Sequence, residues 1–482
     1  MARRGGRTER SAPRTTCPSG QIARNLFTAP RILGALLLLT PTTAFASSNP
    51  WLTPLGSEAA LSGGAVAAMG RDTGNAWYNP AGLGANTRSQ FDMSGTMAVL
   101  RYRVIPGAFR IDLPGGSASS SLTSIEPLVR ATSTVYTRYL GRGVTVGAGH
   151  FVNAYDFYDY NGRLSDSGGK LGAAYDTMVQ VDGLTTRHHF GPTVGWQIRP
   201  RIRIGMSLFF TYESQRDEGR IWAKVGPDAA NVENNYLTGD IDIKRTTYAA
   251  EAVFGLQWEF IRNFHLGFAV RTPRIVAHER VRHFEVVTRG VKLPDGHYSI
   301  DVDTQDGDAV TSARRGRTAP INFVLGLAYA LPRDLGWVSL EGDYSPALQH
   351  VRNNVDLRHT VNGRVGARIR AGEKIIVGFG GFTDRADQTG VQSFPQFNIS
   401  YYGGSMGLEF RRQVKLGAHE RARDIQFLTA VAFRYAYGTG QSGSVVFDVK
   451  RGITAPIVPD YGVVDPVQFH VWGGHLGAGF YF

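Results

Sequence analysis

The sequence predicts an all-β protein: a transmembrane antiparallel β-barrel of about fourteen strands. Three observations carry this prediction: a secretory signal, a ladder of alternating segments and an aromatic C-terminal strand. Glycine (59), tyrosine (20) and phenylalanine (26) are abundant, although the mean hydropathy is only −0.18. A barrel reconciles these facts, because only every second residue of its strands must face lipid.

The N-terminus has the parts of a secretory signal peptide. Seven arginines precede the apolar run 32–39, and Ala44-Phe45-Ala46 supplies a cleavage site, so we expect a signal peptide over 1–46. The run is too short for a membrane-spanning helix, which needs about 20 apolar residues. The only cysteine, Cys17, falls within this segment, so we expect no disulfide after cleavage.

The charge balance argues against a nucleic-acid partner. The chain has 52 basic and 40 acidic residues, and 45 against 39 remain once the signal segment is removed. No basic stripe with interleaved aromatics accompanies this small excess. The acidic stretch 301–308 is spaced somewhat like a calcium loop but lacks its final Glu. We therefore expect no metal and no cofactor.

Alternation of apolar with polar or small residues over about ten positions is typical of membrane-spanning strands. In the clearest segment the apolar positions are Ile202, Ile204, Met206, Leu208, Phe210 and Tyr212. The fourteen candidate strands are 89–101, 125–140, 143–157, 187–199, 201–215, 246–261, 263–275, 318–331, 336–349, 356–370, 374–385, 398–413, 423–438 and 469–482. We expect one barrel domain over 89–482.

The connections support this ladder. They are short after most even-numbered strands and long after several odd-numbered ones, at 158–186, 216–245, 276–317 and 439–468. Short periplasmic turns and long extracellular loops are expected of an outer-membrane barrel with both termini in the periplasm. The basic stretch 314–317 in one long loop is a candidate to meet lipopolysaccharide phosphates, although solvated loop charge is the simpler reading.

The last strand ends the chain on an aromatic residue. One of its faces consists of Trp472, Leu476, Ala478, Phe480 and Phe482. An alternating strand closed by a terminal Phe resembles the recognition signal of outer-membrane barrels. We therefore expect the barrel-assembly machinery of a Gram-negative outer membrane as a partner through Phe482.

The segment 47–88 lies between the signal and the first strand and does not alternate. Small residues dominate it, as in Gly63-Gly64-Ala65-Val66-Ala67-Ala68, and they allow close packing against a wall or within a lumen. Asn79-Pro80-Ala81 then leads into the first strand, where Asn before Pro favours an extended conformation and Pro can begin a short helix. We expect this segment to fold back closely against a wall or inside a lumen.

The Gly/Ala stretch, Asp72 and Asn79-Pro80-Ala81-Gly82-Leu83 together resemble the FadL family of outer-membrane transporters for long-chain fatty acids and related hydrocarbons. The resemblance implies that 47–88 forms an N-terminal hatch, or plug, in the lumen of the barrel. It also implies a hatch role for Asn79, Pro80 and Ala81, for which the alternative is a plain turn. One departure is the stretch 380–387, which keeps Asp384 but lacks the Ser-Pro that the family often shows there.

The resemblance also implies passive uptake of a hydrophobic, fatty acid-like molecule, by capture, hatch movement and lateral release. A water-filled pore serves such a molecule poorly, because exposing apolar surface to water costs about 25 cal/mol per Å². The apolar parity of strand 143–157 slips near Gly149, His150 and Phe151, as a β-bulge would produce, so we expect the lateral opening there. The alternative is that Phe151 simply lines an apolar lumen.

Trp51, Leu52 and Leu55 are candidate lumen contacts for the ligand, or else part of a flexible tail. A general diffusion porin for polar solutes stays open, since charges occupy the inward positions Arg201, Arg203, Glu213, Glu341 and Asp343. A secretion-partner barrel of the same superfamily also stays open. An enzyme is not expected, because His188-His189 has no serine partner at a suitable spacing.

Overall fold

The computed structural model describes Asn49 and residues 51–311, 317–351, 355–391, 394–416, 423–450 and 457–482. The expected signal peptide with Cys17, and residues 314–316 of the basic loop, lie outside the described residues. Among the described residues, no helix is both long enough and apolar enough to cross a membrane.

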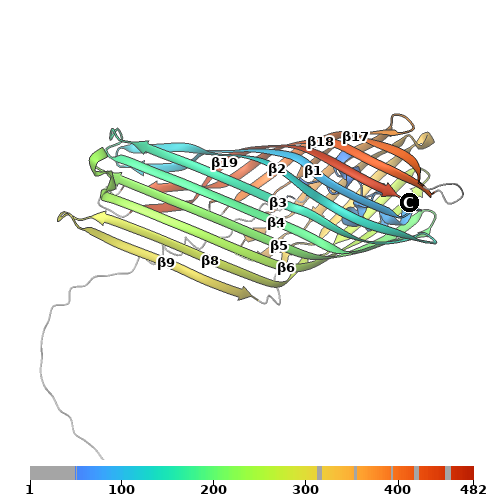
Figure 1. Ribbon diagram of the computed structural model, residues 1–482, viewed down its shortest axis with the longest axis horizontal. Coiled ribbons are helices and arrows are strands. Elements are labelled where there is room, and N and C mark those ends of the chain that lie inside the picture. The colour runs from blue at the N-terminus through green and yellow to red at the C-terminus, as the bar shows by residue number, and fades with distance from the viewer. Residues whose placement is uncertain are drawn as a thin grey trace, which may run out of the picture. The chain divides into compact units, whose positions relative to one another are not determined.

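From Gln90 onward the described chain forms a closed antiparallel β-barrel of fourteen strand positions, which confirms the predicted fold class (Figure 1). The barrel closes where the first strand meets the last, with Gln90 paired to Tyr481 and Val104 paired to Gln468. Two positions are each built from two consecutive segments, β7 with β8 and β10 with β11.

The first strands are β1 (Gln90–Leu113), β2 (Gly116–Gly141), β3 (Val144–Asp166), β4 (Ala174–Arg199), β5 (Ile202–Gly226), β6 (Asn235–Ile261), β7 (Phe264–Arg271), β8 (Arg274–Lys292), β9 (Tyr298–Thr311) and β10 (Arg317–Ala319). The others are β11 (Asn322–Leu331), β12 (Gly336–Ser345), β13 (Leu348–Val351), β14 (Val355–Leu357), β15 (Thr360–Arg370), β16 (Ile375–Asp384), β17 (Phe397–Leu416), β18 (Arg423–Asp448) and β19 (Val458–Tyr481). Short 3-10 helices, η2 (Ala229–Asn234) and η3 (Pro332–Asp334), lie in connections.

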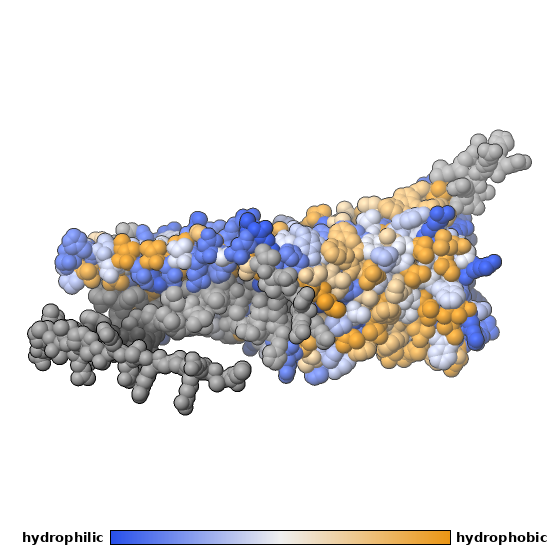
Figure 2. All heavy atoms as spheres, turned by 90° about the horizontal axis from the view of Figure 1, so that it is seen from below, coloured by the Kyte–Doolittle hydropathy of each residue, from blue (hydrophilic) through white to orange (hydrophobic). Residues whose placement is uncertain are grey.

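The outer surface of the barrel is apolar, as lipid contact requires. On β6, Phe254 and Trp258 point outward and are 47% and 43% exposed, whereas Glu251 and Gln257 point inward and are buried. Large exposed apolar side chains recur on the other barrel strands, and Figure 2 shows them gathered over one half of the visible surface. A soluble protein would leave so much apolar surface in water at a large cost in free energy.

Beyond this apolar surface the strands continue with the opposite pattern. Nearer the start of β6, Ile243 and Leu237 point inward and are buried, while Lys244 and Asp240 are exposed. Hydrophilic residues accordingly dominate the other half of the surface in Figure 2. The inversion marks where the strands leave the lipid-facing zone and form a water-exposed extension.

This extension corrects the prediction of long loops at 158–186, 216–245, 276–317 and 439–468. β3 and β4 stay paired as far as Asp166 and Tyr175, and β5 and β6 as far as Val225 and Asn235. The segment after β7 likewise forms a hairpin of β8 with β9. Strand pairing persists because the extension still has a buried inner face, on which apolar side chains such as Ile221, Leu237 and Ile243 lie among polar ones.

The hatch lies in the barrel lumen and contains α2 (Ser57–Leu61), α3 (Asn75–Tyr78) and η1 (Pro80–Ala85). Figure 1 shows these short helices in blue, within the barrel at the end where the C-terminus lies. Leu55, Ala67 and Asn79 are fully buried. Such short helices are stable here because the wall surrounds them, since isolated helices of this length do not persist in water.

Candidate functional site

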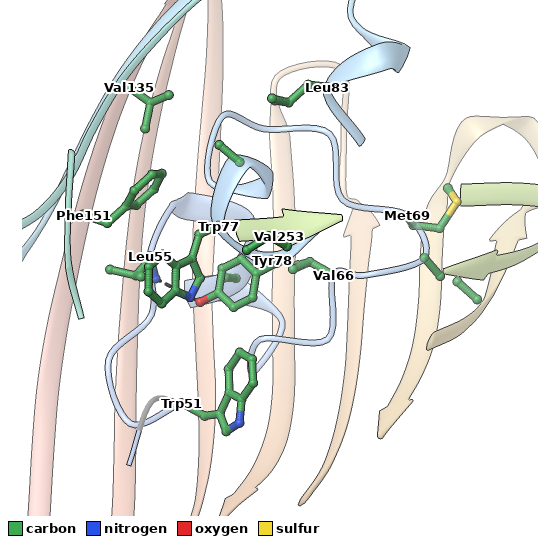
Figure 3. Close-up of a cluster of buried hydrophobic side chains, with 14 of the residues drawn as sticks. Trp51, Leu55, Val66, Met69, Trp77, Tyr78, Leu83, Val135, Phe151 and Val253 are labelled. Atoms are coloured by element: carbon green, nitrogen blue, oxygen red, sulfur yellow. Dashed lines mark hydrogen bonds between the residues drawn. The ribbon is translucent and has the colours of Figure 1, made fainter. Parts of the chain in front are cut away.

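Trp77 of the hatch is the centre of an aromatic cluster that joins the hatch to the wall. Its ring centroid lies 5.7 Å from that of Phe151 on β3 and 5.6 Å from that of Phe209 on β5. Figure 3 shows Leu55, Tyr78 and Trp51 beside it, and Phe151 projecting toward it from the wall. The cluster holds the hatch against the strands that carry the candidate opening.

Asn79 joins three parts of the site through its side chain. The Oδ1 atom accepts a hydrogen bond from the Ala81 backbone at 3.2 Å, and Nδ2 donates to the carbonyls of Ala67 at 2.7 Å and Leu256 at 3.0 Å. The first bond caps η1, which begins with Pro80. The bond to Ala67 connects two parts of the hatch, and the bond to Leu256 connects the hatch to β6.

Two wall glycines allow the Asn-Pro turn to approach this closely. A Cβ atom added at Gly205 would lie 2.3 Å from the Pro80 carbonyl carbon, and one at Gly255 would lie 2.0 Å from Asn79 Oδ1. The two glycines pair with each other across β5 and β6. Only residues without a side chain leave space for the hatch at this level.

Charged side chains of the wall anchor the hatch at other points. Glu58 forms an ion pair with Arg368, and Glu341 accepts a hydrogen bond from the Ala67 backbone at 2.7 Å. Asp384 accepts one from the Trp51 backbone at 2.9 Å. Glu341, which the sequence offered as a candidate porin charge, is therefore bound to the hatch.

A large cavity lies next to the hatch, with an empty volume of about 1280 Å³ that includes its opening to solvent. Trp51, Leu52 and Trp77 line it from the hatch. Its other apolar lining includes Tyr155, Phe397, Ile399, Tyr401 and Phe469, and its charged lining is Arg101, Arg103, Asp156, Arg187, Glu251, Arg271, Arg274, Asp343, Arg385 and Asp387.

Most of the arginines of this cavity have carboxylate partners. Arg101 binds Asp156 at 2.7 Å, and Arg187 binds Glu213 at 2.6 Å. Arg271 binds Glu251 at 2.7 Å and also places its guanidinium carbon 3.8 Å from the centre of the Trp77 ring. The cavity surface therefore combines aromatic faces with ion pairs that neutralise each other.

The wall beside the cavity is interrupted. Thr123 pairs with Asn161, and pairing of β2 with β3 resumes only at Ser133 and Phe151. Residues 124–132 and 152–160, which we call the open seam, have no ladder pairs with each other. On the opposite side, the register of β3 with β4 shifts between Val152 and Ala154, as at a β-bulge.

Side chains bridge the open seam in place of backbone pairs. Arg101 on β1 donates to the Asp156 carboxylate and, at 2.9 Å, to the Tyr155 carbonyl. Arg130 on β2 donates to the same carbonyl at 3.4 Å. These links involve side chains that can change rotamer, so the seam is less firmly closed than a strand ladder.

The residues expected at a lateral opening lie at the edge of the open seam. Gly149 and His150 are paired with both β2 and β4, and Phe151 is the last paired residue before the seam. His150 stacks on Phe190 at a centroid distance of 4.4 Å, whereas Phe151 is fully buried against the hatch. Leu55 lies within the hatch cluster, while Trp51 and Leu52 line the cavity.

The sequence interpretation did not single out Arg101, Arg130 or Asp156, although these residues bridge the seam. The available signal was the loss of clean alternation in strand 125–140 and the parity slip in its neighbour. Charged residues on two neighbouring strands that both lose their alternation suggest that side chains bridge the strands. Which charge meets which cannot be predicted, because it depends on the register of the strands.

The structure is therefore a closed barrel with a plugged lumen, a cavity beside the plug and an interrupted wall. No protein-family model and no curated protein sequence matches the chain. The toluene transporter TodX of P. putida superimposes with a TM-score of 0.54 at 12% identity, over 89% of this chain and 98% of that chain.

A toluene transporter of Ralstonia pickettii, TbuX, gives a TM-score of 0.51 at 14% identity, over 89% of this chain and 98% of that chain. A FadL homologue of Pseudomonas aeruginosa gives a TM-score of 0.49 at 12% identity, over 89% of this chain and 98% of that chain. The likeness to the two toluene transporters shows that this chain has their barrel fold.

Proposed function

We propose that the protein is an outer-membrane channel for passive uptake of hydrophobic small molecules, with lateral release through the open seam. The ligand enters from the water-exposed extension, rests in the large cavity against Trp51 and Leu52, and leaves between β2 and β3. The hatch, fixed through Asn79, Pro80 and Ala81, blocks the straight route. Lipopolysaccharide would surround the barrel, and the strand ending at Phe482 would engage the assembly machinery.

The observation that carries this proposal is the position of the seam beside the cavity. Asn153, Ala154, Tyr155 and Asp156 line the cavity and also belong to the part of β3 that has no ladder pairs with β2. An apolar ligand that leaves here passes from a protein cavity into lipid without crossing water, which avoids a cost of about 25 cal/mol per Å². The names of TodX and TbuX describe transport of toluene, an apolar molecule.

The charged part of the cavity favours a second candidate, a diffusion porin for polar solutes. Six arginines and four acids line the cavity, which is more than an apolar ligand needs. Against this candidate, the hatch occupies the lumen and its contacts with Arg368, Glu341 and Asp384 of the wall would have to break for a straight pore to form.

The test compares uptake of labelled toluene and oleate by cells that produce the native chain or Ala154→Trp. Ala154 lies in the seam, so an indole there should obstruct the exit and abolish most uptake. Ala148→Trp, on the paired and exposed part of the same strand, is the matched control and should retain it. Equal uptake by all three chains would refute lateral release.

Swelling of proteoliposomes in sugar solutions separates the two candidates. A channel with a plugged lumen should admit no sugar, whereas a porin should admit it and should do so equally with Ala154→Trp.

A further inference from the structure

β3 contains one extra residue at the edge of the open seam. The ladder of β3 with β4 includes Val152 and Ala154 but skips Asn153, which has no ladder partner on β4. Such an insertion is a β-bulge, and a bulge bends the strand that contains it. Asn153 is 5% exposed and lines the large cavity. The bulge therefore lies where a ligand in the cavity would meet the seam.

The bulge changes which residues of β3 face the lumen. Before it, the buried side chains belong to odd-numbered residues such as Thr145 and Phe151, and after it they belong to Tyr158 and Tyr160. Because the side chains of a strand alternate between its two faces, a shift of one residue exchanges the faces. The position of the bulge therefore decides which side chains of the seam line the exit.

His189 on β4 holds the bulged residue. Its Nε2 atom lies 2.9 Å from Asn153 Oδ1. The other ring nitrogen, Nδ1, lies 3.1 Å from the Thr211 hydroxyl on β5 and 3.2 Å from Glu251 Oε1 on β6. The His189 side chain is fully buried, so water does not compete for these contacts. One imidazole thus connects the bulge with β5 and β6.

The His189 ring also packs against the hatch. Its centroid lies 4.7 Å from that of Trp77, with an angle of 74° between the ring planes, which is an edge-to-face contact. Phe151 approaches the same Trp77 ring from β3, as Figure 3 shows. His189 lies behind the cavity surface, whereas its partners Trp77, Asn153 and Glu251 line the cavity. The ring therefore fixes three parts of that surface relative to one another.

We propose that His189 is a positioning residue that fixes the bulge at Asn153 and thereby sets the size of ligand that the open seam admits. Along the seam β3 has no ladder with β2, so that ladder cannot fix the register of β3 there. The bond to His189 holds the extra residue itself. Without this bond β3 can straighten toward β2, and the exit becomes narrower. The inference rests on the proposed function and deepens it: the seam is the exit, and His189 sets its width.

The experiment measures uptake of labelled toluene and of labelled phenanthrene, which is wider, by cells that produce the native chain or a variant. Leucine has no hydrogen-bonding group but can still pack against Trp77, so His189→Leu removes the anchor of the bulge. Phenanthrene uptake relative to toluene uptake should fall by about fivefold, as expected from the loss of one buried hydrogen bond. His189→Gln keeps an amide that can bond to Asn153 and should restore most of this ratio.

The matched control is His265→Leu. His265 on β7 is another buried histidine of the barrel, 7% exposed, and it lies outside the large cavity. This variant should take up the two ligands in the native ratio. An unchanged ratio in His189→Leu, or an equal loss of uptake of both ligands, would overturn the proposal.

A second variant separates positioning of the bulge from a general structural role of His189. Asn153→Ala removes the same hydrogen bond from the other side, so it should lower the ratio as His189→Leu does. The double variant should lower the ratio no further, because both substitutions remove one interaction. Additive losses would overturn the link between the two residues. Asn153→Ala also tests the proposal if His189→Leu does not fold.

The proposed function fails in a different way. Ala154→Trp should block uptake of both ligands if the seam is the exit. A block by Ala154→Trp together with a native ratio in His189→Leu would leave lateral release standing and would reject the role of His189. Native uptake of both ligands by Ala154→Trp would refute lateral release itself, and the size limit with it.

Discussion

Arg101 on β1 reaches across β2 to Asp156 on β3, with 2.7 Å between Nη1 and Oδ1. Arg103 binds the same carboxylate, and Glu126 lies 3.5 Å from Arg103. A buried cluster of two arginines and two acids therefore stands where the β2–β3 ladder is absent. Ion pairs of this cluster link β1, β2 and β3 across the seam, and each ion pair is lost when either of its partners is removed.

Removal of Asp156 should therefore destabilise the seam. Asp156→Asn leaves Arg101 and Arg103 with only the more distant Glu126, and loss of one partner from a buried ion pair costs about 3–5 kcal/mol. We expect a lower thermal unfolding midpoint in nanodiscs and faster backbone hydrogen exchange over 124–132 and 152–160.

Asp176→Asn is the control for this prediction. Asp176 pairs with Arg163, whose side chain is 65% exposed, on the water-exposed extension. An exposed pair of this kind contributes about 0–1 kcal/mol, so the midpoint should hardly move. Equal effects of the two substitutions would mean that the seam cluster carries no special stability.

Asn79→Ala should loosen the hatch without unfolding the barrel. The substitution removes the side-chain hydrogen bonds from Asn79 to the Ala67 and Leu256 carbonyls, although Gln257 still donates to the Ala67 carbonyl at 3.1 Å. Each hydrogen bond lost costs about 0.5–1.5 kcal/mol. We expect increased protease cleavage within 51–86 and leakage of small sugars into proteoliposomes. Asn161→Ala removes only an exposed hydrogen bond to Asp159 and should cause neither change.

Gly205→Val should expel the turn that contains Pro80. The new Cβ atom would lie 2.3 Å from a backbone carbon, and the hatch backbone has no room to retreat. We expect a folded barrel, seen as heat-modifiable mobility in gels, with an accessible hatch. Gly363→Ala adds its Cβ atom in open space and should behave as the native chain. A protected hatch in Gly205→Val would disprove this close packing.

The barrel was predictable because its signal is local. Phe254 and Trp258 alternate with inward polar residues, and this alternation by itself indicates a strand with one face toward lipid and the other toward the lumen. The extension was missed because its alternation is inverted: Ile243 and Leu237 are inward, and charged outward residues look like loop composition. Only the register with β5 and β8 shows that pairing continues.

The site was less predictable, since its groups come from distant strands. The Asn79 turn could be found from Asn-Pro and the small residues around it. The contact of Arg101 with Asp156 could not, because the two residues are 55 positions apart in sequence and meet across β2 only where the β2–β3 ladder is absent. That interruption is a three-dimensional property that no sequence pattern expresses.

The water-exposed extension contains a buried acid. Asp217 on β5 is 6% exposed and accepts hydrogen bonds from the Tyr158 hydroxyl at 2.8 Å and the Gln215 amide at 2.5 Å. Burial raises the pKa of Asp217 from 3.8 to about 6, against the opposing effect of these two hydrogen bonds. At any given pH between these two values, the carboxyl of Asp217 is therefore protonated to a greater extent in the folded state than in the unfolded state.

The sign of the pH dependence follows from this preference. Because the folded pKa lies above the unfolded one, the contribution is fully present below pH 3.8 and is lost as pH rises through about 6. The loss is roughly 3 kcal/mol at about 1.4 kcal/mol per pKa unit. Asp217→Asn should remove it, so the unfolding midpoint should rise relative to the native chain at pH 7 but not at pH 4. An equal difference between the two chains at both pH values would show that Asp217 does not titrate in this range.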